Sequence, residues 1–187
     1  VSHTFFYWEI GGSGGTHRTF KTALNLIVDD HHLLSLCYNY SIHDAPGAPS
    51  GTGDGISSAA QESASMFSLL YGKVIYSRSP RFRTIVKWGI SGGEVLTPTN
   101  FTSNNSWYGS SYDFTLVRTT VVGFVLNPTI ELAKPHSGFS FGLYANINGV
   151  SPIVGIEGSM IFGKLRNKSK VDIKQPRPPK KSRSHIK

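Results

Sequence analysis

The stretch Ser151-Pro-Ile-Val-Gly-Ile-Glu-Gly-Ser-Met-Ile-Phe-Gly-Lys-Leu-Arg166 decides the fold of this 187-residue chain. Read with the two-residue period of a β-strand, it has one apolar face, made of Val154, Ile156, Met160 and Phe162. The opposite face carries small or polar residues, namely Gly155, Glu157, Ser159 and Gly163. This pattern suits a strand whose outer face contacts lipid and whose inner face lines a narrow, hydrated lumen. We therefore interpret the chain as a membrane-spanning β-barrel.

The same alternation recurs between turn signals along the chain, and we expect a strand in each such segment. The segments span about residues 3–12, 18–28, 33–42, 65–76, 81–90, 112–126, 138–146 and 151–166. The fourth alternates poorly, because Lys73 does not sort with its neighbours unless a bulge intervenes. The sequence predicts an all-β fold, an eight-stranded antiparallel transmembrane up-and-down β-barrel over residues 1–166. A disordered, basic, Pro-rich C-terminal tail follows over residues 167–187.

The connections predict the orientation of the barrel. Segments 11–17, 43–64 and 94–111 are long or Gly-rich, whereas 29–32 and 77–80 are tight and 127–137 is of moderate length. The short seventh connection, 146–150, departs from this trend. Outer-membrane barrels have short periplasmic turns and long outward loops. We therefore expect a barrel in the bacterial outer membrane with both termini in the periplasm, and an export signal removed before Val1.

Composition supports this architecture, and the net charge comes entirely from residues 166–187. Hydrophobic residues make up only 39% of the chain, while aromatic residues reach 12% and there are 20 glycines. No run of about 18 apolar residues occurs, which excludes a helical span. From Arg166 onward the chain carries nine Lys and Arg residues and one Asp, which accounts for the whole net charge of +8. The single cysteine, Cys37, excludes an internal disulfide framework.

Charged residues fall on the inward face of the predicted strands. They are the acids Glu9, Asp113 and Glu157 and the bases Lys21, Arg83 and Lys87. An eight-stranded barrel is filled by its own side chains, and an unpaired ion there costs several kcal/mol. We predict a structural ion-pair network in the lumen; the functional alternative is a proton or ion path along these residues.

Arg118 conflicts with the pattern, because its parity places it toward lipid between Leu116 and Thr120. A cation at the bilayer midplane costs roughly 2–4 kcal/mol. Three solutions remain open. The strand rises above the membrane, a bulge turns Arg118 inward, or a partner protein covers it.

Three motifs carry a resemblance to a known class of proteins. They are Gly155-Ile-Glu-Gly-Ser-Met-Ile-Phe-Gly-Lys-Leu, Leu70-Tyr-Gly-Lys-Val and Val86-Lys-Trp-Gly-Ile-Ser-Gly-Gly. With them the chain resembles the small outer-membrane β-barrels of Bacteroidota over most of residues 3–166. The resemblance implies an accessory subunit of an envelope machine, an adhesin-like barrel or a porin-like protein. The basic tail departs from the usual pattern, in which the chain stops at the aromatic residue of the final strand.

No catalytic or metal-binding pattern is convincing. Gly11-Gly-Ser-Gly-Gly15 matches the G-x-S-x-G nucleophile motif, but a predicted strand follows it where that motif requires a helix. The seven histidines show no metal-ligand spacing. We expect no catalytic residue, no cofactor and no metal.

The tail is a candidate docking segment. Its basic residues, Lys174, Arg177, Lys180, Lys181 and Arg183, lie among prolines that stiffen the chain. No aromatic residue is interleaved for base stacking, so we expect no nucleic acid partner. Outer-membrane lipid and other envelope proteins, bound through the lipid-facing wall and the tail, are the expected partners.

The leading functional hypothesis is a non-enzymatic outer-membrane barrel that serves as a structural or accessory subunit of a larger envelope complex. Protein export, outer-membrane protein insertion and nutrient uptake are the candidate assemblies. One alternative is a lipid-modifying enzyme, which requires a Ser, a His and an acid at the outer rim, with Ser13 and His17 as candidates. The other is a soluble ligand-binding barrel of lipocalin type, which would have apolar residues inside and polar ones outside.

Overall fold

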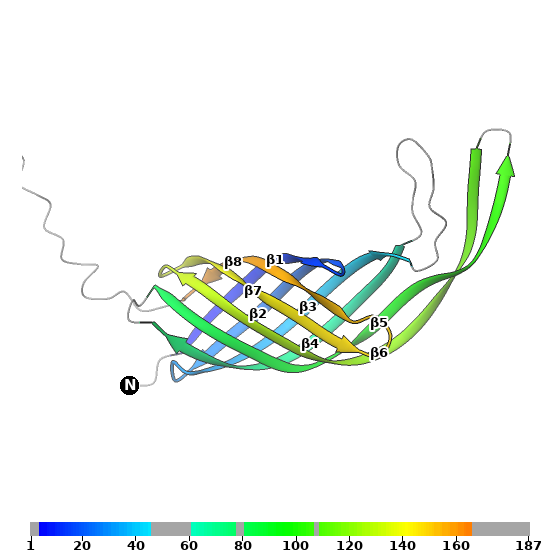
Figure 1. Cartoon of the computed structure of the whole chain (residues 1–187). Helices are drawn as coiled ribbons and strands as arrows, with labels where there is room; N and C mark the ends of the chain where they lie inside the picture. Colours follow the sequence, from blue (N-terminus) through cyan, green and yellow to red (C-terminus); the bar gives the residue numbers. More distant parts are fainter. Residues whose placement is uncertain (1–3, 46–60, 78–80, 107–108, 166–187) are drawn as a thin grey trace, which may run out of the picture.

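Eight strands close into one antiparallel barrel (Figure 1). The computed structural model describes residues 4–45, 61–77, 81–106 and 109–165. The strands are β1 Phe5–Gly15, β2 Arg18–Val28, β3 His32–Asp44, β4 Gln61–Tyr76, β5 Phe82–Ser106, β6 Gly109–Ala133, β7 Ser137–Asn148 and β8 Ile153–Gly163. Each pairs with the next, and β1 pairs with β8 to close the ring. The predicted eight-stranded fold is confirmed; the five tail residues proposed for docking lie outside the described residues.

The outer face of the wall is apolar, whereas the inner face carries buried charged residues. Leu143 and Ile156 on the outer face are 57% and 56% exposed, whereas Lys87 and Glu157 on the inner face are 0% and 1% exposed. A soluble lipocalin-type barrel has the reverse arrangement. The observed one suits a barrel surrounded by lipid, as the alternation in the sequence predicted.

No helix in the described part of the chain is long and apolar enough to span a membrane.

Tight turns lie at the end of the barrel where the described chain begins and ends (Figure 1). Asp29 and Asp30 between β2 and β3 both have positive φ, 53° and 60°, and the His31 N–H donates to the Val28 carbonyl at 3.3 Å. Two left-handed central residues define a type I′ turn, whose twist matches the flanking strands. The Leu165 N–H donates to the Pro135 carbonyl at 3.0 Å, which ties the end of the described chain to the β6–β7 turn.

β5 and β6 are far longer than the sequence predicted. Residues 94–111 were expected to form a loop, but most of them extend β5 and β6 into a hairpin that projects beyond the barrel (Figure 1). This hairpin lies beyond the last pairs with β4 and β7, and residues 97–111 show no apolar alternation that would mark a strand in the sequence. A register shift between Thr99 and Thr102, with Asn100 at φ 57°, bends this hairpin.

At the other end, residues 127–137 were expected to form a connection, but β6 continues to Ala133. Pro128 reads as a turn signal in the sequence, because proline cannot donate to a strand ladder. The structure compensates for the missing donor: Asn127 Nδ2 donates to the Leu143 carbonyl at 2.6 Å. Asn127 and Pro128 have no registered partners in β7, and the pairing resumes unshifted at Thr129.

β4 also begins earlier than predicted, at Gln61, and alternates regularly without a bulge. Lys73 is exposed on its outer face near the short-turn end. The earlier start brings Glu62 into the barrel wall.

The lumen contains more apolar side chains than the small and polar inner face that the sequence predicted. Two clusters of buried apolar side chains occupy it, one containing Met66, Val95 and Tyr144 and the other containing Tyr7, Ile85 and Ile161. Along β5, Lys87 lies between Ile85 of one cluster and Val95 of the other. The buried ammonium of Lys87 is therefore enclosed between two apolar layers.

The lipid-facing wall gives a direct test. Leu143 lies at the middle of β7, so Leu143→Arg should destabilise the barrel in vesicles by roughly 2–4 kcal/mol. Val150 in the β7–β8 turn is 48% exposed, and Val150→Arg should cost no more than about 1 kcal/mol. Urea unfolding in vesicles measures both; equal effects would contradict a bilayer around β7.

Candidate functional site

The centre of the lumen is a shared ion pair around Lys21. Its Nζ lies 3.0 Å from Glu9 Oε1 and 3.0 Å from Glu157 Oε2, and all three side chains are at most 3% exposed. β1, β2 and β8 are neighbours in the ring, so the inward positions of these strands bring the three groups together.

Lys87 and two amides complete this network. Lys87 Nζ donates to Glu9 Oε2 at 3.1 Å from the far wall, and Asn25 Nδ2 donates to the same oxygen at 3.3 Å. Asn127 accepts from Lys21 at 3.2 Å and donates to Glu157 Oε1 at 2.7 Å. Two carboxylates thus face two ammonium groups, and the amides take up remaining hydrogen-bonding capacity, as buried ions require.

A second buried ion pair lies toward the short-turn end. Arg83 Nε donates to Glu131 Oε2 at 2.7 Å, and Tyr7 Oη donates to Glu131 Oε1 at 2.9 Å. Arg83 Nη1 also donates to the Leu165 carbonyl at 3.0 Å, and its guanidinium lies 5.0 Å from the Tyr7 ring centroid. The end of the described chain is thereby fixed against the barrel interior.

The structure places five of the six predicted lumen residues inside the barrel: Glu9, Lys21, Arg83, Lys87 and Glu157. Asp113 is the exception and corrects the prediction. It is exposed on the part of β6 that projects beyond the barrel, where inward parity no longer points into a lumen. Glu131 takes the place of the third acid. The sequence analysis missed it because Pro128 suggested that the strand had ended.

Arg118 lies on the projecting hairpin as well. It pairs in register with Leu96, five residues beyond Gly123, the last β6 residue paired with β7. Arg118 Nη1 lies 3.4 Å from Glu94 Oε2, and the two side chains are 66% and 47% exposed. The strand therefore rises beyond the barrel wall, the first of the three solutions open at the sequence level.

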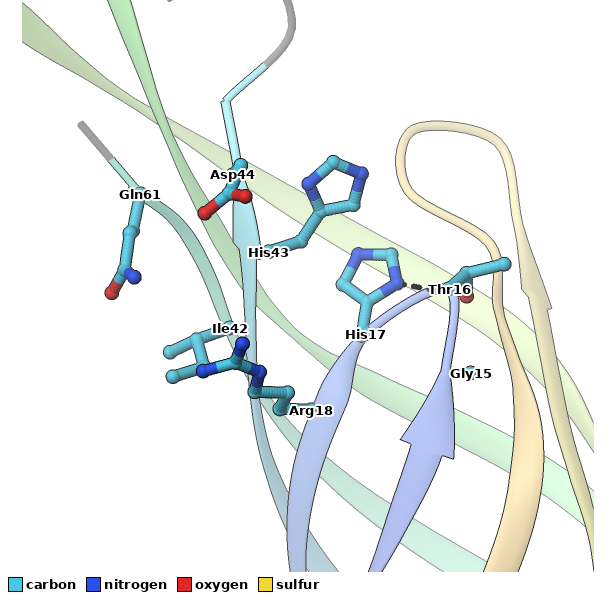
Figure 2. Close-up of a pocket in the computed structure, with 8 residues that line it drawn as sticks. All are labelled: Gly15, Thr16, His17, Arg18, Ile42, His43, Asp44 and Gln61. Atoms are coloured by element: carbon cyan, nitrogen blue, oxygen red, sulfur yellow. Dashed lines mark hydrogen bonds between the residues drawn. The ribbon is translucent and has the colours of Figure 1, made fainter. Parts of the chain in front are cut away.

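At the end of the barrel opposite to where the described chain begins and ends, a rim cluster joins five segments of the chain, namely the β1–β2 turn, β3, β4, β5 and the β7–β8 turn. It consists of His17, His43, Glu62, Thr97 and Ser151. Ser151 Oγ donates to Glu62 Oε1 at 2.5 Å, Thr97 Oγ1 donates to Glu62 Oε2 at 2.9 Å, and His17 Nε2 lies 2.9 Å from Ser151 Oγ. The His17 and His43 rings meet edge to face at 4.8 Å. They line a pocket of about 220 Å³, where Figure 2 shows the two imidazoles facing each other and Arg18 beside Ile42.

The rim cluster contains a serine, a histidine and an acid, but not in the arrangement of a hydrolase. In a catalytic triad the acid bonds the histidine Nδ1 and the histidine accepts the serine proton. Here the Ser151 hydroxyl donates its hydrogen bond to Glu62 Oε1, so Ser151 Oγ accepts from His17 Nε2, and His17 Nδ1 lies 3.0 Å from Thr16 Oγ1. Within the described residues the Oγ of Ser13, the serine considered at the sequence level, has no hydrogen-bond partner, and the Ser13 backbone pairs with Glu157 and Thr19 in the strand ladders.

Burial lowers the pKa of His17 below its ordinary value, and the neighbouring His43 lowers it further, while Glu62 acts in the opposite direction. Among the residues that the structure describes, no group of three or more His, Cys, Asp and Glu side chains could hold a metal ion. The arrangement is suited to fastening the β1–β2 and β7–β8 turns across the barrel mouth.

No protein-family model matches this sequence, and no curated protein matches it. Solved structures do match the fold. The N-terminal β-barrel domain of Pseudomonas aeruginosa OprF matches with a TM-score of 0.60 and 10% identity, over 87% of this chain and 99% of that one. The fold is that of small outer-membrane β-barrels.

Two further structures agree with this fold. The Yersinia pestis outer membrane protein Ail in a phospholipid bilayer nanodisc has a TM-score of 0.51 and 9% identity, over 86% of this chain and 99% of that one. Neisserial surface protein A has a TM-score of 0.50 and 11% identity, over 87% of this chain and 94% of that one. At these identities the likeness concerns the fold.

Removing Lys21 tests the energetics of the lumen. Lys21→Met should destabilise the barrel by about 3–5 kcal/mol, because Glu157 then retains only an amide partner. In the double variant Lys21→Met/Glu157→Gln the second change should recover part of that loss, since Glu9 and Lys87 remain paired. Urea unfolding of both variants in vesicles gives the comparison; additive losses would argue against the coupling.

The rim cluster predicts a pH dependence of stability. Because the folded-state pKa of His17 lies below its ordinary value, the unfolded chain binds a proton first as the pH falls. The stability conferred by neutral His17 is present above about pH 6.5 and decreases as the pH falls below it. Unfolding midpoints at pH 8 and pH 5.5 should therefore differ less in His17→Gln than in the unchanged chain. The same difference in both would contradict this assignment.

Proposed function

We propose that this chain is a non-enzymatic barrel of the bacterial outer membrane that serves as an accessory subunit of a larger envelope complex. Its termini lie in the periplasm, its β5–β6 hairpin lies outside the cell, and its source is a member of the Bacteroidota. The filled lumen supports a scaffold over a conduit, and the donor pattern of the rim cluster supports a structural role over hydrolysis.

The observation that carries the proposal is the projecting hairpin. Residues 97–106 of β5 lie beyond the last pair with β4, and residues 109–122 of β6 lie beyond the last pair with β7. At a rise of about 3.3 Å per residue, the β5 segment alone is on the order of 33 Å long. A two-stranded ribbon of this kind is marginally stable in water by itself.

The hairpin also exposes apolar side chains outside the wall. Phe114, Leu116 and Val117 are 42%, 55% and 44% exposed, and Phe114 packs on Phe101 with ring centroids 6.1 Å apart. Leu116 and Val117 are adjacent in the strand and therefore point to opposite faces of the ribbon. Apolar groups on both faces favour a protein partner that contacts the hairpin. The basic tail, with Lys174, Arg177, Lys180, Lys181 and Arg183, is proposed as a second contact on the periplasmic side.

The experiment compares the barrel before and after the hairpin is altered. Purified under mild detergent, the unchanged chain should be recovered in a stoichiometric complex, and Leu116→Asp/Val117→Asp should release it as a folded monomer. Val150→Asp, at the same end of the barrel but off the hairpin, should leave the complex intact. Mass spectrometry measures the assembly, and the heat-dependent shift on SDS gels verifies folding. A monomer in every case, or a complex that survives the double substitution, would contradict the role assigned to the hairpin.

A further inference from the structure

One part of the outer wall is hollow. Around most of the barrel the outward positions carry large apolar side chains, but near the far end of β1 they are Gly12 and Gly14. Gly12 pairs with Gly158 of β8 on one side and with Phe20 of β2 on the other. Phe20 in turn pairs with Tyr40 of β3. Two glycines side by side, bordered by an aromatic pair, leave a depression in the wall.

The depression has the size of a small-molecule site. Its volume is about 310 Å³, and its lining consists of Gly12, Ser13, Arg18, Thr19, Phe20, Tyr40 and Ile42. Ligand sites start near 300 Å³. A stable protein–protein contact needs about 800 Å² on each partner, far more than this hollow offers. An extended hydrocarbon chain is therefore a better occupant than a protein.

A cation lies at the edge of the hollow nearest the loop end of the barrel. Arg18 is exposed, pairs in register with Ile42, and follows the row of Phe20 and Tyr40 by one step toward the loop end. Figure 2 shows its side chain beside Ile42 and turned away from His17 and His43. Within the described residues Arg18 makes no ion pair, whereas Arg118, at the same end, is paired with Glu94.

Aromatic side chains with a cation one step farther along the wall are typical of the depth at which the lipid tails meet the headgroups. A guanidinium is a planar donor that can bind a phosphate with two parallel hydrogen bonds. Apolar lining below and an unpaired cation above thus match the two halves of an anionic lipid.

We propose that this hollow binds one phosphate-bearing lipid from the leaflet at the loop end. The phosphate lies on Arg18, and one acyl chain lies over Gly12 between the wall strands, beside Phe20 and Tyr40. The inference rests on the proposed insertion of the barrel in a membrane. It adds a specific lipid-binding site to an outer wall that would otherwise contact all lipids equally.

Two substitutions probe the two halves of the site. Arg18→Gln removes the cation. Gly14 does not line the hollow but follows Gly12 on the same outward face, so Gly14→Leu brings bulk to its edge; a Cβ at Gly14 meets nothing within 4 Å, and the backbone accepts it. Their matched controls are Lys73→Gln, which removes an exposed cation near the other end, and Gly149→Leu, which adds the same bulk at a glycine that is equally open but lies in the β7–β8 turn.

Native mass spectrometry from an uncharged detergent, with dilauroyl phosphatidylglycerol as the probe, measures binding. We expect one tightly retained lipid per barrel, binding roughly tenfold weaker in Arg18→Gln and in Gly14→Leu, and unchanged binding in both controls. Dilauroylglycerol, which lacks the phosphate, and inorganic phosphate, which lacks the chains, should each compete poorly.

Several results would overturn the inference. One is equal retention of the lipid in all four variants. Another is a loss of lipid in Arg18→Gln alone, or competition by inorganic phosphate as strong as by the lipid; either would mean a site for the anion without a groove for the acyl chain. A barrel that inserts in vesicles but retains no lipid refutes the lipid site and leaves the proposed function standing. A chain that does not insert at all refutes the proposed function first.

Discussion

Neutralisation of buried charge is the constraint on which this barrel depends. Glu9 and Glu157 point into a space with apolar layers above and below, and a carboxylate there is stable only with a cation and hydrogen-bond donors around it. Lys21 and Lys87 supply the charge and Asn25 and Asn127 the donors. This requirement fixes which face of each strand turns inward, because a slip by one residue would move every ion into the surrounding hydrocarbon.

The side-chain interactions inside the barrel differ from layer to layer along its axis. The ion pairs of Lys21 and Lys87 occupy the middle, and apolar clusters lie on both sides of them. The Arg83–Glu131 pair lies toward the short-turn end, and the rim cluster fastens the turns at the far end. The features to which we assign recognition of other molecules are on the outside, namely the extended β5–β6 hairpin and the hollow beside Arg18.

The sequence predicted the ring of strands and most of the lumen, because both follow from a two-residue alternation that every strand in the wall obeys. Glu9, Lys21 and Lys87 were placed inward by parity alone, and the coordinates place them there. Asp113 was misplaced because the alternation continues through residues 112–116, past the last pair with β7, and so does not mark where the wall ends. The length of β5 and β6 was missed because residues 97–111 carry no apolar alternation. Glu131 was hidden by Pro128, whose missing donor is replaced by the side chain of Asn127, a compensation visible only in three dimensions. The rim cluster joins residues more than a hundred positions apart and has no signature in local spacing.

The contact between Lys21 and Glu157 has a consequence for assembly. It links the second strand to the last, across the seam at which β1 meets β8, and joins positions 136 residues apart in the chain. A sheet still open at that seam would leave Glu157 without its ammonium partner in an apolar environment, so partly closed intermediates are penalised electrostatically as well as by their free edges. The pairing of β1 with β8 and the pairing of Lys21 with Glu157 are thus completed in the same step. The final closure is therefore all-or-none, and the release of an incompletely closed sheet into the lipid is disfavoured.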